Sequence, residues 1–407
     1  MRALMQTKRS YLSVMAVAFF APWLWVSAQT TSRPTITPSL THVDPGQSHQ
    51  FKIEIDGKAA TGVSWTVNDV KGGNATFGTI SSSGVYTAPP KMPSPREIHI
   101  HAIIARPRKF HVWATVIVGP GAPTYRMVSR WGGKGSGPGK FTDPHALCFD
   151  RDHNLIITDA IAGRVYRYTR DGKLISELGS GPGSDAGQFK GPRDVKIDKA
   201  GNIFVSDGDN HRIQVFSPSG KFLRTFGQKG TDPGEMLRVH AIYFAPDGRL
   251  YAADVDNSRI MVFDDAGKFL FEWGKAGTAP GEFHAPHGLG GDANGDVFVS
   301  NYWGSCQKFT GDGKYLFEFA VPNEKGFTHA HAMASDKWGD AYILARDKTN
   351  RCAIVKYNNN GTYITQWPEL KPVTEWGVKD ALIDDDGTVY AGIESKKDVG
   401  IEIYREE

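Results

Sequence analysis

The sequence predicts an all-β protein, and three observations support that expectation. From about residue 125 onward, a pattern of short apolar strands and glycine turns recurs six times. Residues 33–119 alternate apolar and polar positions, as strands with one buried face do. The first 28 residues resemble neither part. We therefore expect a leader, a small β-sandwich over residues 33–119, a linker at 120–124 and a larger repeat domain over 125–407.

The leader has the composition of a secretory signal peptide. Arg2, Lys8 and Arg9 give it a positive start, residues 11–26 are mostly apolar, and Val26-Ser-Ala28 offers small residues for cleavage. The alternative is an uncleaved anchor helix, but the apolar stretch is shorter than the roughly 20 residues that a membrane span requires. Residues 1–28 are predicted to be removed, which would leave a periplasmic or secreted protein without a membrane span.

Residues 33–119 are predicted to form the sandwich because period-2 runs alternate with turn residues. Such runs are Gln50–Ile55, Val63–Val67 and Ile98–Ile104. The segment Gly78–Pro89 resembles the bacterial Ig-like family, and this resemblance implies that Trp65 packs in the core. We assign this domain no chemistry and expect Gly, Pro and Ala at 119–123 to form a hinge.

The second domain consists of six similar units, each with an apolar strand, a glycine turn, a second strand and a third that ends in an aromatic residue. The units begin at His145, Arg193, His240, His287, His331 and Lys379, so that successive starts lie 48, 47, 47, 44 and 48 residues apart. A period in the forties with several strands per unit is typical of propeller blades. Residues 125–407 are therefore predicted to form a six-bladed β-propeller.

Tyr125–Trp131 precedes the first unit and is similar to the fourth strand of other units, such as Lys221–Phe226. We expect it to complete the sixth blade, so that the two ends of the domain pair. The units also resemble the NHL repeat family, most clearly over Val205–Phe216 and Ala253–Phe263. This resemblance implies a fold rather than a function.

The residue that begins each unit is expected at one end of the propeller channel. Four of these six residues are histidines, although the whole chain has only 13 among 407 residues. His145, His240 and His331 come from alternate blades, so their imidazoles can converge as a zinc site with an open fourth position requires. They are predicted to bind zinc or another divalent metal. The alternative is that they line a wet channel and bond to water or carbonyl groups.

Arg193, His287 and Lys379 interleave with these histidines and are predicted to bind the substrate. Two fixed cations would repel a divalent metal in a low-dielectric channel unless an anion lay between them. This arrangement favours a small anionic molecule or a peptide as ligand. The alternative is that Arg193 and Lys379 pair with acids such as Asp194 or Asp380.

Residues 140–336 resemble the lyase domain of peptide-amidating enzymes, peptidyl-hydroxyglycine (peptidylamidoglycolate) lyase. The similar stretches are Pro144–Leu147, Val205–Gly208, Phe216–Phe222, Pro233–Ile242 and His331–Asp336. That family is a six-bladed NHL-type propeller with zinc held by three histidines. The resemblance places these ligands at His145, His240 and His331, and it implies bond cleavage at a hemiaminal-like carbon with the metal polarising a substrate oxygen.

The sequence departs from that family at three functional positions. The family's active-site tyrosine falls on Asp209, one of its arginines on Val255 and its calcium-binding aspartate on Ala332. The resemblance therefore carries over the metal ligands but not the residues that transfer protons or bind the carboxylate. It favours a related lyase or hydrolase activity over amidating-lyase activity itself.

Replacements for the missing residues are expected on loops. Asn301-Tyr-Trp-Gly304 departs from the repeat where other units have Asp, and Arg346 is expected on a similar loop of blade five. Tyr302 and Arg346 are the predicted catalytic residues, as a general acid/base and an anion clamp, with Trp303 as an apolar wall against the substrate. Ordinary loop variation is the alternative. His329 is expected on the opposite strand face in a structural role.

Bulk composition narrows the remaining function classes. A net charge of +3 without a basic run gives no support for nucleic-acid binding. Cys148 is expected to be a buried thiol, whereas a Cys306–Cys352 bridge is left open. We expect a monomer that is either a metal-dependent lyase or hydrolase, or a non-catalytic NHL propeller that binds protein, peptide or glycan.

Overall fold

The structure is a computed structural model that describes residues 32–105, 109–322, 326–348, 352–367, 377–394 and 399–407. The expected leader, residues 1–28, lies outside these ranges. The described chain is built from strands and turns, together with two 3-10 helices, η1 (Gly208–Asn210) and η2 (Val255–Asn257). Neither the length nor the hydropathy of any helix in these ranges would allow it to cross a membrane.

The N-terminal part forms three small sheets around an apolar core. Trp65 and Val67 lie in that core, packed with Ile98, Ile100 and Val116. β2 pairs with β12 in parallel, which joins the first strands of this part to its last. The sheets, in strand order, are β1 (Thr35–Thr37), β4 (Lys52–Ile55) and β5 (Lys58–Ala59); β3 (Ser48–Gln50), β10 (Val85–Thr87), β9 (Gly78–Ile80) and β8 (Gly73–Asn74); and β2 (Leu40–Val43), β12 (Phe110–Val118), β11 (Glu97–Ile104), β6 (Val63–Val67) and β7 (Val70–Lys71).

The described residues after 124 form six four-stranded antiparallel sheets, five of which use consecutive strands. These five are β14 (Pro144–Phe149), β15 (Leu155–Asp159), β16 (Arg164–Tyr168) and β17 (Leu174–Leu178); β18 (Pro192–Ile197), β19 (Ile203–Asp207), β20 (Arg212–Phe216) and β21 (Phe222–Phe226); β22 (Val239–Phe244), β23 (Leu250–Asp254), β24 (Arg259–Phe263) and β25 (Phe269–Trp273); β26 (Pro286–Gly291), β27 (Val297–Asn301), β28 (Ser305–Phe309) and β29 (Tyr315–Ala320); and β30 (Phe327–Ser335), β31 (Ala341–Asp347), β32 (Cys352–Tyr357) and β33 (Tyr363–Trp367).

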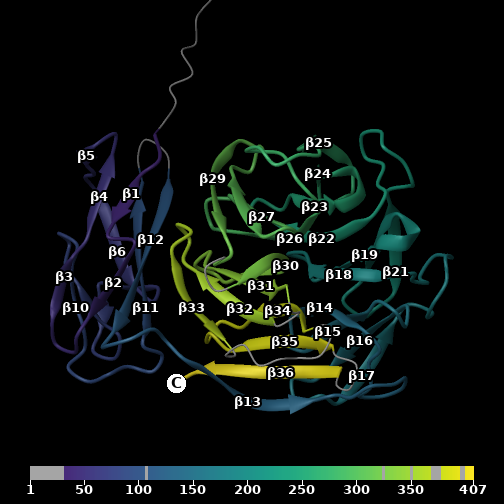
Figure 1. Cartoon of the computed structure of the whole chain (residues 1–407), viewed down its shortest axis with the longest axis horizontal. Coiled ribbons are helices and arrows are strands. Elements are labelled where there is room, and N and C mark those ends of the chain that lie inside the picture. The colour runs from purple at the N-terminus through teal and green to yellow at the C-terminus, as the bar shows by residue number, and fades with distance from the viewer. Residues whose placement is uncertain (1–31, 106–108, 323–325, 349–351, 368–376, 395–398) are drawn as a thin grey trace, which may run out of the picture.

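The remaining sheet joins the two ends of this part of the chain. Its order is β13 (Tyr125–Trp131), β36 (Val399–Glu406), β35 (Val389–Glu394) and β34 (Val378–Ile383). β13, the strand expected to complete the last unit, pairs antiparallel with β36. The first strands β14, β18, β22, β26, β30 and β34 contact one another in that order, and β34 contacts β14, so the six sheets close into a ring. Figure 1 shows these strands at the centre and β17, β21, β25 and β13 at the periphery.

In the first four of these sheets, the second strand ends in a buried Asp or Asn side chain that binds the loop before the first strand. Asp159 accepts hydrogen bonds from the backbone of Thr142 and Asp143, in the loop that leads into β14. Asp207 and Asp254 do the same in the next two sheets, and the Asn301 side chain takes this role in the fourth. These residues are structural, since they fix the approach to the first strand.

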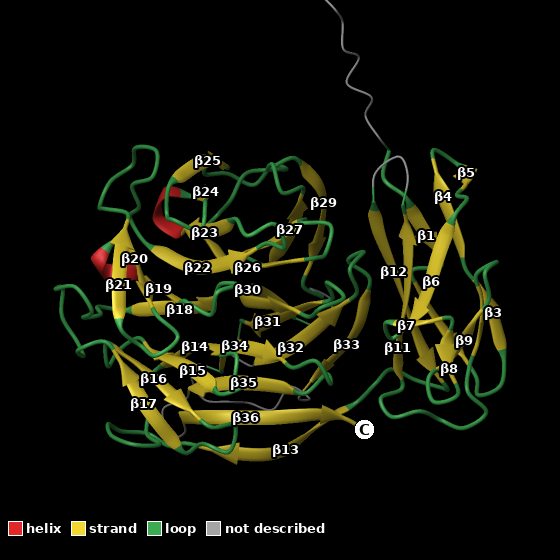
Figure 2. Cartoon of the chain, turned by 180° about the vertical axis from the view of Figure 1, so that it is seen from behind, coloured by secondary structure: helices red, strands yellow, loops and turns green. Residues whose placement is uncertain are grey.

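The N-terminal sheets pack directly on the ring, beside β33 in Figures 1 and 2. The Asn294 side chain bonds both the backbone N–H and the carbonyl of His111, and Asn360 donates to the carbonyl of Trp113. The expected hinge is also held, because Thr365 donates to the carbonyl of Pro123. Backbone groups buried at the junction need partners, and these bonds supply them.

All three cysteines are free thiols. Cys148 and Cys306 are buried, and burial raises the pKa of the Cys148 thiol to about 12. Cys352 lies on β32, in the sheet next to that of Cys306, and the bridge that the sequence left open is not formed.

Candidate functional site: a histidine-lined cavity at one end of the ring

A cavity of about 850 Å³ opens at one end of the ring. It is lined by residues from all six sheets and from the loops and turns next to their strands. All six residues that begin the repeats line it, together with Asp143, Ile161, Arg238, Val255, Asp256, Ser258, His284, Ala285, Tyr302, Trp303 and Glu394. The predicted ring of His145, Arg193, His240, His287, His331 and Lys379 is thus brought together around a single cavity.

Each of these six residues is the extra residue of a β-bulge in its first strand. The register between β14 and β15 shifts between Pro144 and Ala146, which leaves His145 unpaired in the ladder. The same shift occurs at the other five positions, between the residues on either side of the ring residue. A bulge turns the extra side chain away from the normal alternation of the strand. It therefore directs every ring residue to the cavity while the rest of the strand packs between the sheets.

Three of the bulges are fixed by a hydroxyl group on the neighbouring second strand. The backbone N–H of Ala146 donates to Thr158 Oγ1 at 3.0 Å, and that of Asp194 donates to Ser206 Oγ at 2.7 Å. Gly288 N–H donates to Ser300 in the same way. These hydroxyls replace the ladder partner that the bulge removes, so His145, Arg193 and His287 are held by buried hydrogen bonds.

The imidazoles are oriented by backbone carbonyls of neighbouring strands. His145 Nδ1–H donates to the carbonyl of Arg193 at 2.9 Å, and His240 Nδ1–H donates to the carbonyl of His287 at 3.1 Å. These bonds fix the tautomer that leaves Nε2 with a free lone pair, as in histidines that bind metal. Nδ1 of His331 is buried and has no hydrogen-bond partner among the described residues. Burial lowers the pKa of His145 and His287 to about 4 and that of His240 and His331 well below 6.5, so all four are neutral at pH 7.

The donor chemistry of His145, His240 and His331 fits a divalent metal, whereas their spacing is wider than one ion requires. Ring centroids are 4.9 Å apart for His145 and His240 and 6.2 Å apart for His240 and His331. A tetrahedral ion with Zn–N bonds of about 2 Å holds such centroids roughly 5 Å apart. The three do not form a group with ligand atoms all within 4.8 Å of one another in the part of the chain that is described. Sharing one ion would require His331 to move closer to His240.

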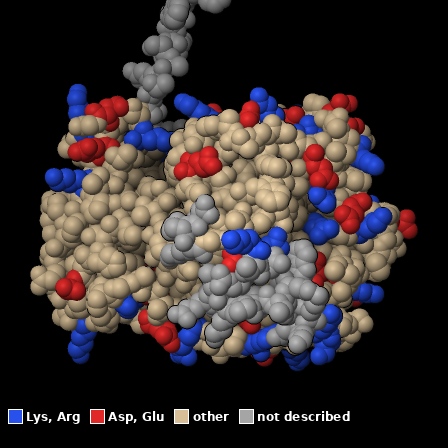
Figure 3. Space-filling view, viewed as in Figure 1, with Lys and Arg blue, Asp and Glu red and all other residues tan. Residues whose placement is uncertain are grey.

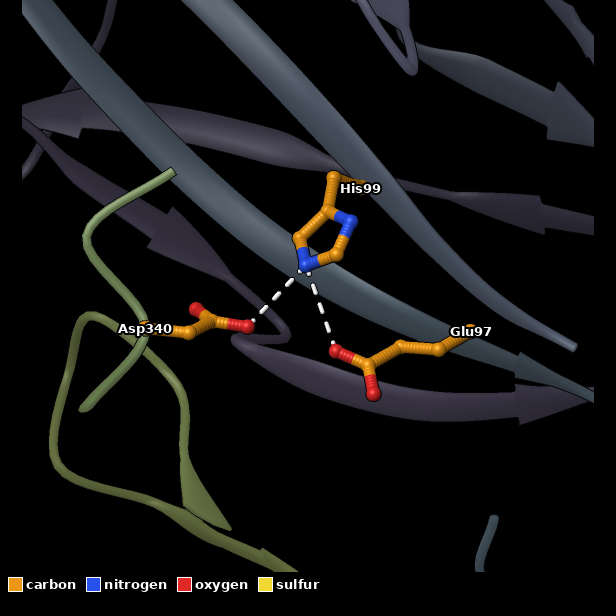
Figure 4. A group of neighbouring side chains, drawn as sticks. All are labelled: Glu97, His99 and Asp340. Atoms are coloured by element: carbon orange, nitrogen blue, oxygen red, sulfur yellow. Dashed lines mark hydrogen bonds and ion pairs between the residues drawn. The ribbon is translucent and has the colours of Figure 1, made fainter. Parts of the chain in front are cut away.

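Glu97, His99 and Asp340 do form such a compact group, at the junction between the N-terminal sheets and the ring (Figure 4). His99 Nε2 lies 3.2 Å from Glu97 Oε1 and 3.0 Å from Asp340 Oδ2. Lys356 Nζ already lies 2.5 Å from Glu97 Oε1. Although burial lowers the pKa of His99, Asp340 and Glu97 raise it to about 9. Two cations thus balance the two carboxylates, and a further divalent charge would be repelled. This group is a buried ion network that joins the two parts.

The cationic residues of the cavity are largely paired with acids. Lys379 Nζ lies 2.7 Å from Glu394 and 3.2 Å from Asp143, rather than beside the Asp380 that the sequence suggested. The Arg193 guanidinium is 3.8 Å from Asp209, a longer and weaker contact. Lys379 is therefore neutralised where the sequence predicted an anion-binding residue, and Arg193 remains the freer cation. On the face seen in Figure 3, basic and acidic side chains are interspersed and neither forms a patch of one sign over the N-terminal sheets.

Tyr302 and Trp303 lie on the turn between β27 and β28 and line the cavity, as expected. The expectation for Arg346 was wrong in two respects. It lies on β31 rather than a loop, paired with His329, and its Nη2 donates to Tyr302 Oη at 2.5 Å. It is thus a partner of Tyr302 and does not line the main cavity. The His329 ring is 5.1 Å from Tyr302 and 4.9 Å from Trp303, so it supports this turn.

Sequence reasoning missed several residues of the cavity. Asp143 and Arg238 lie two positions before a ring residue, and extending the repeat comparison by two residues would have found them. Glu394 is equivalent to Tyr302 in the repeat. The backbone N–H of Glu394 donates to the carbonyl of Gly377, two residues before Lys379, and that of Tyr302 donates to the carbonyl of Ala285, two residues before His287. That equivalence was hidden because the last unit is spaced differently in the sequence.

Residues 189–216 match the NHL repeat. Comparison with curated proteins gives no match. Among solved structures, a protein of unknown function from Bacteroides thetaiotaomicron matches with a TM-score of 0.53 at 16% identity, over 94% of this chain and 99% of that one. A gluconolactonase from Xanthomonas campestris matches with a TM-score of 0.50 at 13% identity, over 71% and 98%. A streptogramin B lyase has a TM-score of 0.48 at 13% identity, over 70% and 98%. The chain therefore carries an NHL repeat and has an all-β fold similar to that of propeller proteins.

Proposed function

We propose that this chain is an exported, six-bladed NHL-type propeller with an N-terminal Ig-like domain that binds zinc or another divalent metal at His145, His240 and His331. The observation that carries the proposal is the orientation of His145 and His240. Their Nδ1–H groups donate to backbone carbonyls, and each Nε2 lone pair is left for the cavity. The positive start and apolar run of residues 1–28 support export.

The proposed activity is lyase or hydrolase chemistry on a small anionic or peptide substrate. A metal bound at these histidines supplies polarisation of a substrate oxygen. Tyr302 holds a proton at Oη, where Arg346 Nη2 donates to the same oxygen and fixes its direction. That geometry suits general acid/base transfer to a group beside His287, whose ring centroid is 4.9 Å from that of Tyr302. Arg193 orients an anionic group, and Trp303 excludes water from one side of the cavity.

The second candidate is a non-catalytic propeller that binds a protein, peptide or glycan in this cavity. The spacing of the three histidines favours it, because their ligand atoms are more than 4.8 Å apart as a group within the described ranges. The near balance of acidic and basic residues in the cavity, with Lys379 between Asp143 and Glu394, also suits a ligand without strong charge.

Metal analysis of the purified full chain tests the two proposals. The first predicts about one equivalent of tightly bound metal, lost in the His145→Ala/His240→Ala/His331→Ala variant. A control variant, His49→Ala/His153→Ala, changes two histidines that do not line the cavity and should keep the metal. A folded wild-type protein that holds no metal after dialysis against zinc would remove the first proposal and leave the second.

A hydroxyglycine-extended peptide tests the amidating-lyase form of the activity. Asp209, Val255 and Ala332 occupy the positions where that family has its tyrosine, arginine and calcium ligand. We expect no cleavage of this peptide by metal-loaded protein. Turnover would mean that Tyr302 and Arg193 replace the family's residues.

A further inference from the structure

Two strongly exposed apolar side chains stand at the mouth of the histidine-lined cavity. Ile161 is 66% exposed and Trp303 57%, the two highest values for large apolar side chains in the described part of the chain. Both line the cavity. Single exposed apolar residues are common on protein surfaces, but two at one cavity mouth suggest a ligand that covers them.

Their positions in the repeat are equivalent and opposite. Ile161 and Trp303 each lie two residues after the residue that ends the second strand, Asp159 and Asn301. The two intervening sheets place Asp209 and Asp256 at this position. Because β14 and β26 are three steps apart in the ring of six first strands, the apolar residues face each other across the mouth.

Both apolar residues are held in place. The Trp303 ring lies 5.3 Å from Tyr302, 4.9 Å from His329 and 5.7 Å from His284. The turn that carries Ile161 is fixed because Asp159 accepts the backbone N–H of Ala162. A ligand that packs on such preformed surfaces loses little further entropy in ordering them.

Arg193 and Arg238 lie between the two apolar residues, Arg193 on β18 and Arg238 directly before β22. Arg193 is 3.8 Å from Asp209, and Arg238 is 2.7 Å from Asp256 through Nη2 only. Among the described residues, Arg193 thus lies beyond hydrogen-bond distance of Asp209, and Arg238 uses only one Nη group for Asp256. The remaining Nη donors are left for an anion, and a carboxylate can take two such donors at once.

We propose that the cavity binds an amphipathic carboxylate, with its head between Arg193 and Arg238 and its apolar body on Trp303 or Ile161. The inference rests on this cavity being the site of the proposed function, and it names the class of ligand. It needs no metal, because the recognising groups are arginines and apolar side chains.

Calorimetric titration of the full chain with acetate, butanoate, hexanoate and octanoate tests the proposal. In EDTA at pH 7, we expect Kd to fall by up to about fourfold for each added methylene. Trp303→Ala or Ile161→Ala should flatten this dependence. Leu223→Ala, at an equally apolar but distant site with 44% exposure, should not. Arg193→Ala should weaken the binding of all four carboxylates by a similar factor. Octylammonium should bind to the wild-type protein more weakly than octanoate.

A Kd independent of chain length, or an unchanged dependence in the Trp303→Ala/Ile161→Ala double variant, would overturn the inference. The result separates it from the metal proposal. A dependence of Kd on chain length in protein that binds no metal would support the proposed ligand class and contradict the metal proposal. One equivalent of bound metal without a dependence of Kd on chain length would support the metal proposal and contradict the proposed ligand class.

Discussion

Lys356→Met should strongly destabilise the protein, because Lys356 is the cation of a fully buried ion pair. Its Nζ lies 2.5 Å from Glu97 Oε1 and 3.7 Å from Asp340 Oδ2, and the side chains of Lys356 and Glu97 are 3% and 2% exposed. Removal of Lys356 leaves two buried carboxylates with His99 as their remaining close cation. Breaking one partner of such a pair costs about 3–5 kcal/mol.

Urea unfolding of the full chain, followed by tryptophan fluorescence at pH 7, measures this loss. Lys275→Met is the matched control, since Lys275 is 77% exposed in its pair with Glu282 and should cost about 1 kcal/mol or less. The Glu97→Gln/Lys356→Met double variant removes both charges and should recover more than half of the loss. If Lys356→Met were as stable as Lys275→Met, the network would be solvated, and the junction would not be the fixed contact described above.

Three further predictions concern the bulges, the packing of the ring and the junction. Thr158→Val removes the hydroxyl that accepts the backbone hydrogen bond at the bulge of His145. It should lower the unfolding free energy by about 1–3 kcal/mol and weaken zinc binding about tenfold to 100-fold in a chelator competition. Thr158→Ser keeps the hydroxyl and should have neither effect. Gly288→Ala should lower the unfolding free energy by about 1–3 kcal/mol, because its Cβ would lie 2.5 Å from a backbone nitrogen of β30. The control Gly133→Ala should lower it less, because its Cβ would meet only a flexible lysine side chain. The melting temperature should fall as the pH rises from 7 to 9, and the Glu406→Gln variant should gain stability relative to the wild type as the pH rises from 5 to 7.

The sign of the pH effect follows from two groups at the junction. Burial raises the pKa of Glu406 from 4.5 to about 7, so the folded state keeps a proton that the unfolded chain releases, and stability falls between these values. For His99, burial opposes the rise, but Asp340 and Glu97 raise its pKa from 6.5 to about 9. Its contribution is complete below pH 6.5 and is lost as the pH rises through 9.

Each of these predictions has an outcome that contradicts it. Equal zinc affinity of the valine and serine variants of Thr158 would mean that the hydroxyl does not hold His145. Equal stability of Gly288→Ala and Gly133→Ala would mean that β26 and β30 can separate at no cost. A Glu406→Gln profile parallel to that of the wild type would remove Glu406 from the titration.

The regular spacing of the six units was sufficient to predict the all-β repeat domain and its six ring residues. Periodicity is a local property of the chain, and equivalent positions in a closed repeat must lie at equivalent depths. It also indicated that Tyr125–Trp131 would pair with the last strand, because an unpaired edge is unfavourable. The sequence did not reveal the bulges that aim these residues, since a bulge is defined by pairing with a neighbouring strand.

Tertiary structure alone decided the partners of the charged and aromatic groups. It placed Lys379 between Asp143 and Glu394, set Arg346 against Tyr302, and buried Lys356 beside Glu97 of the N-terminal part. These pairs join residues that are 15 to 259 positions apart, and no local pattern specifies which acid meets which base. Charge pairing depends on distances of a few ångströms, and only the packing of sheet on sheet fixes those.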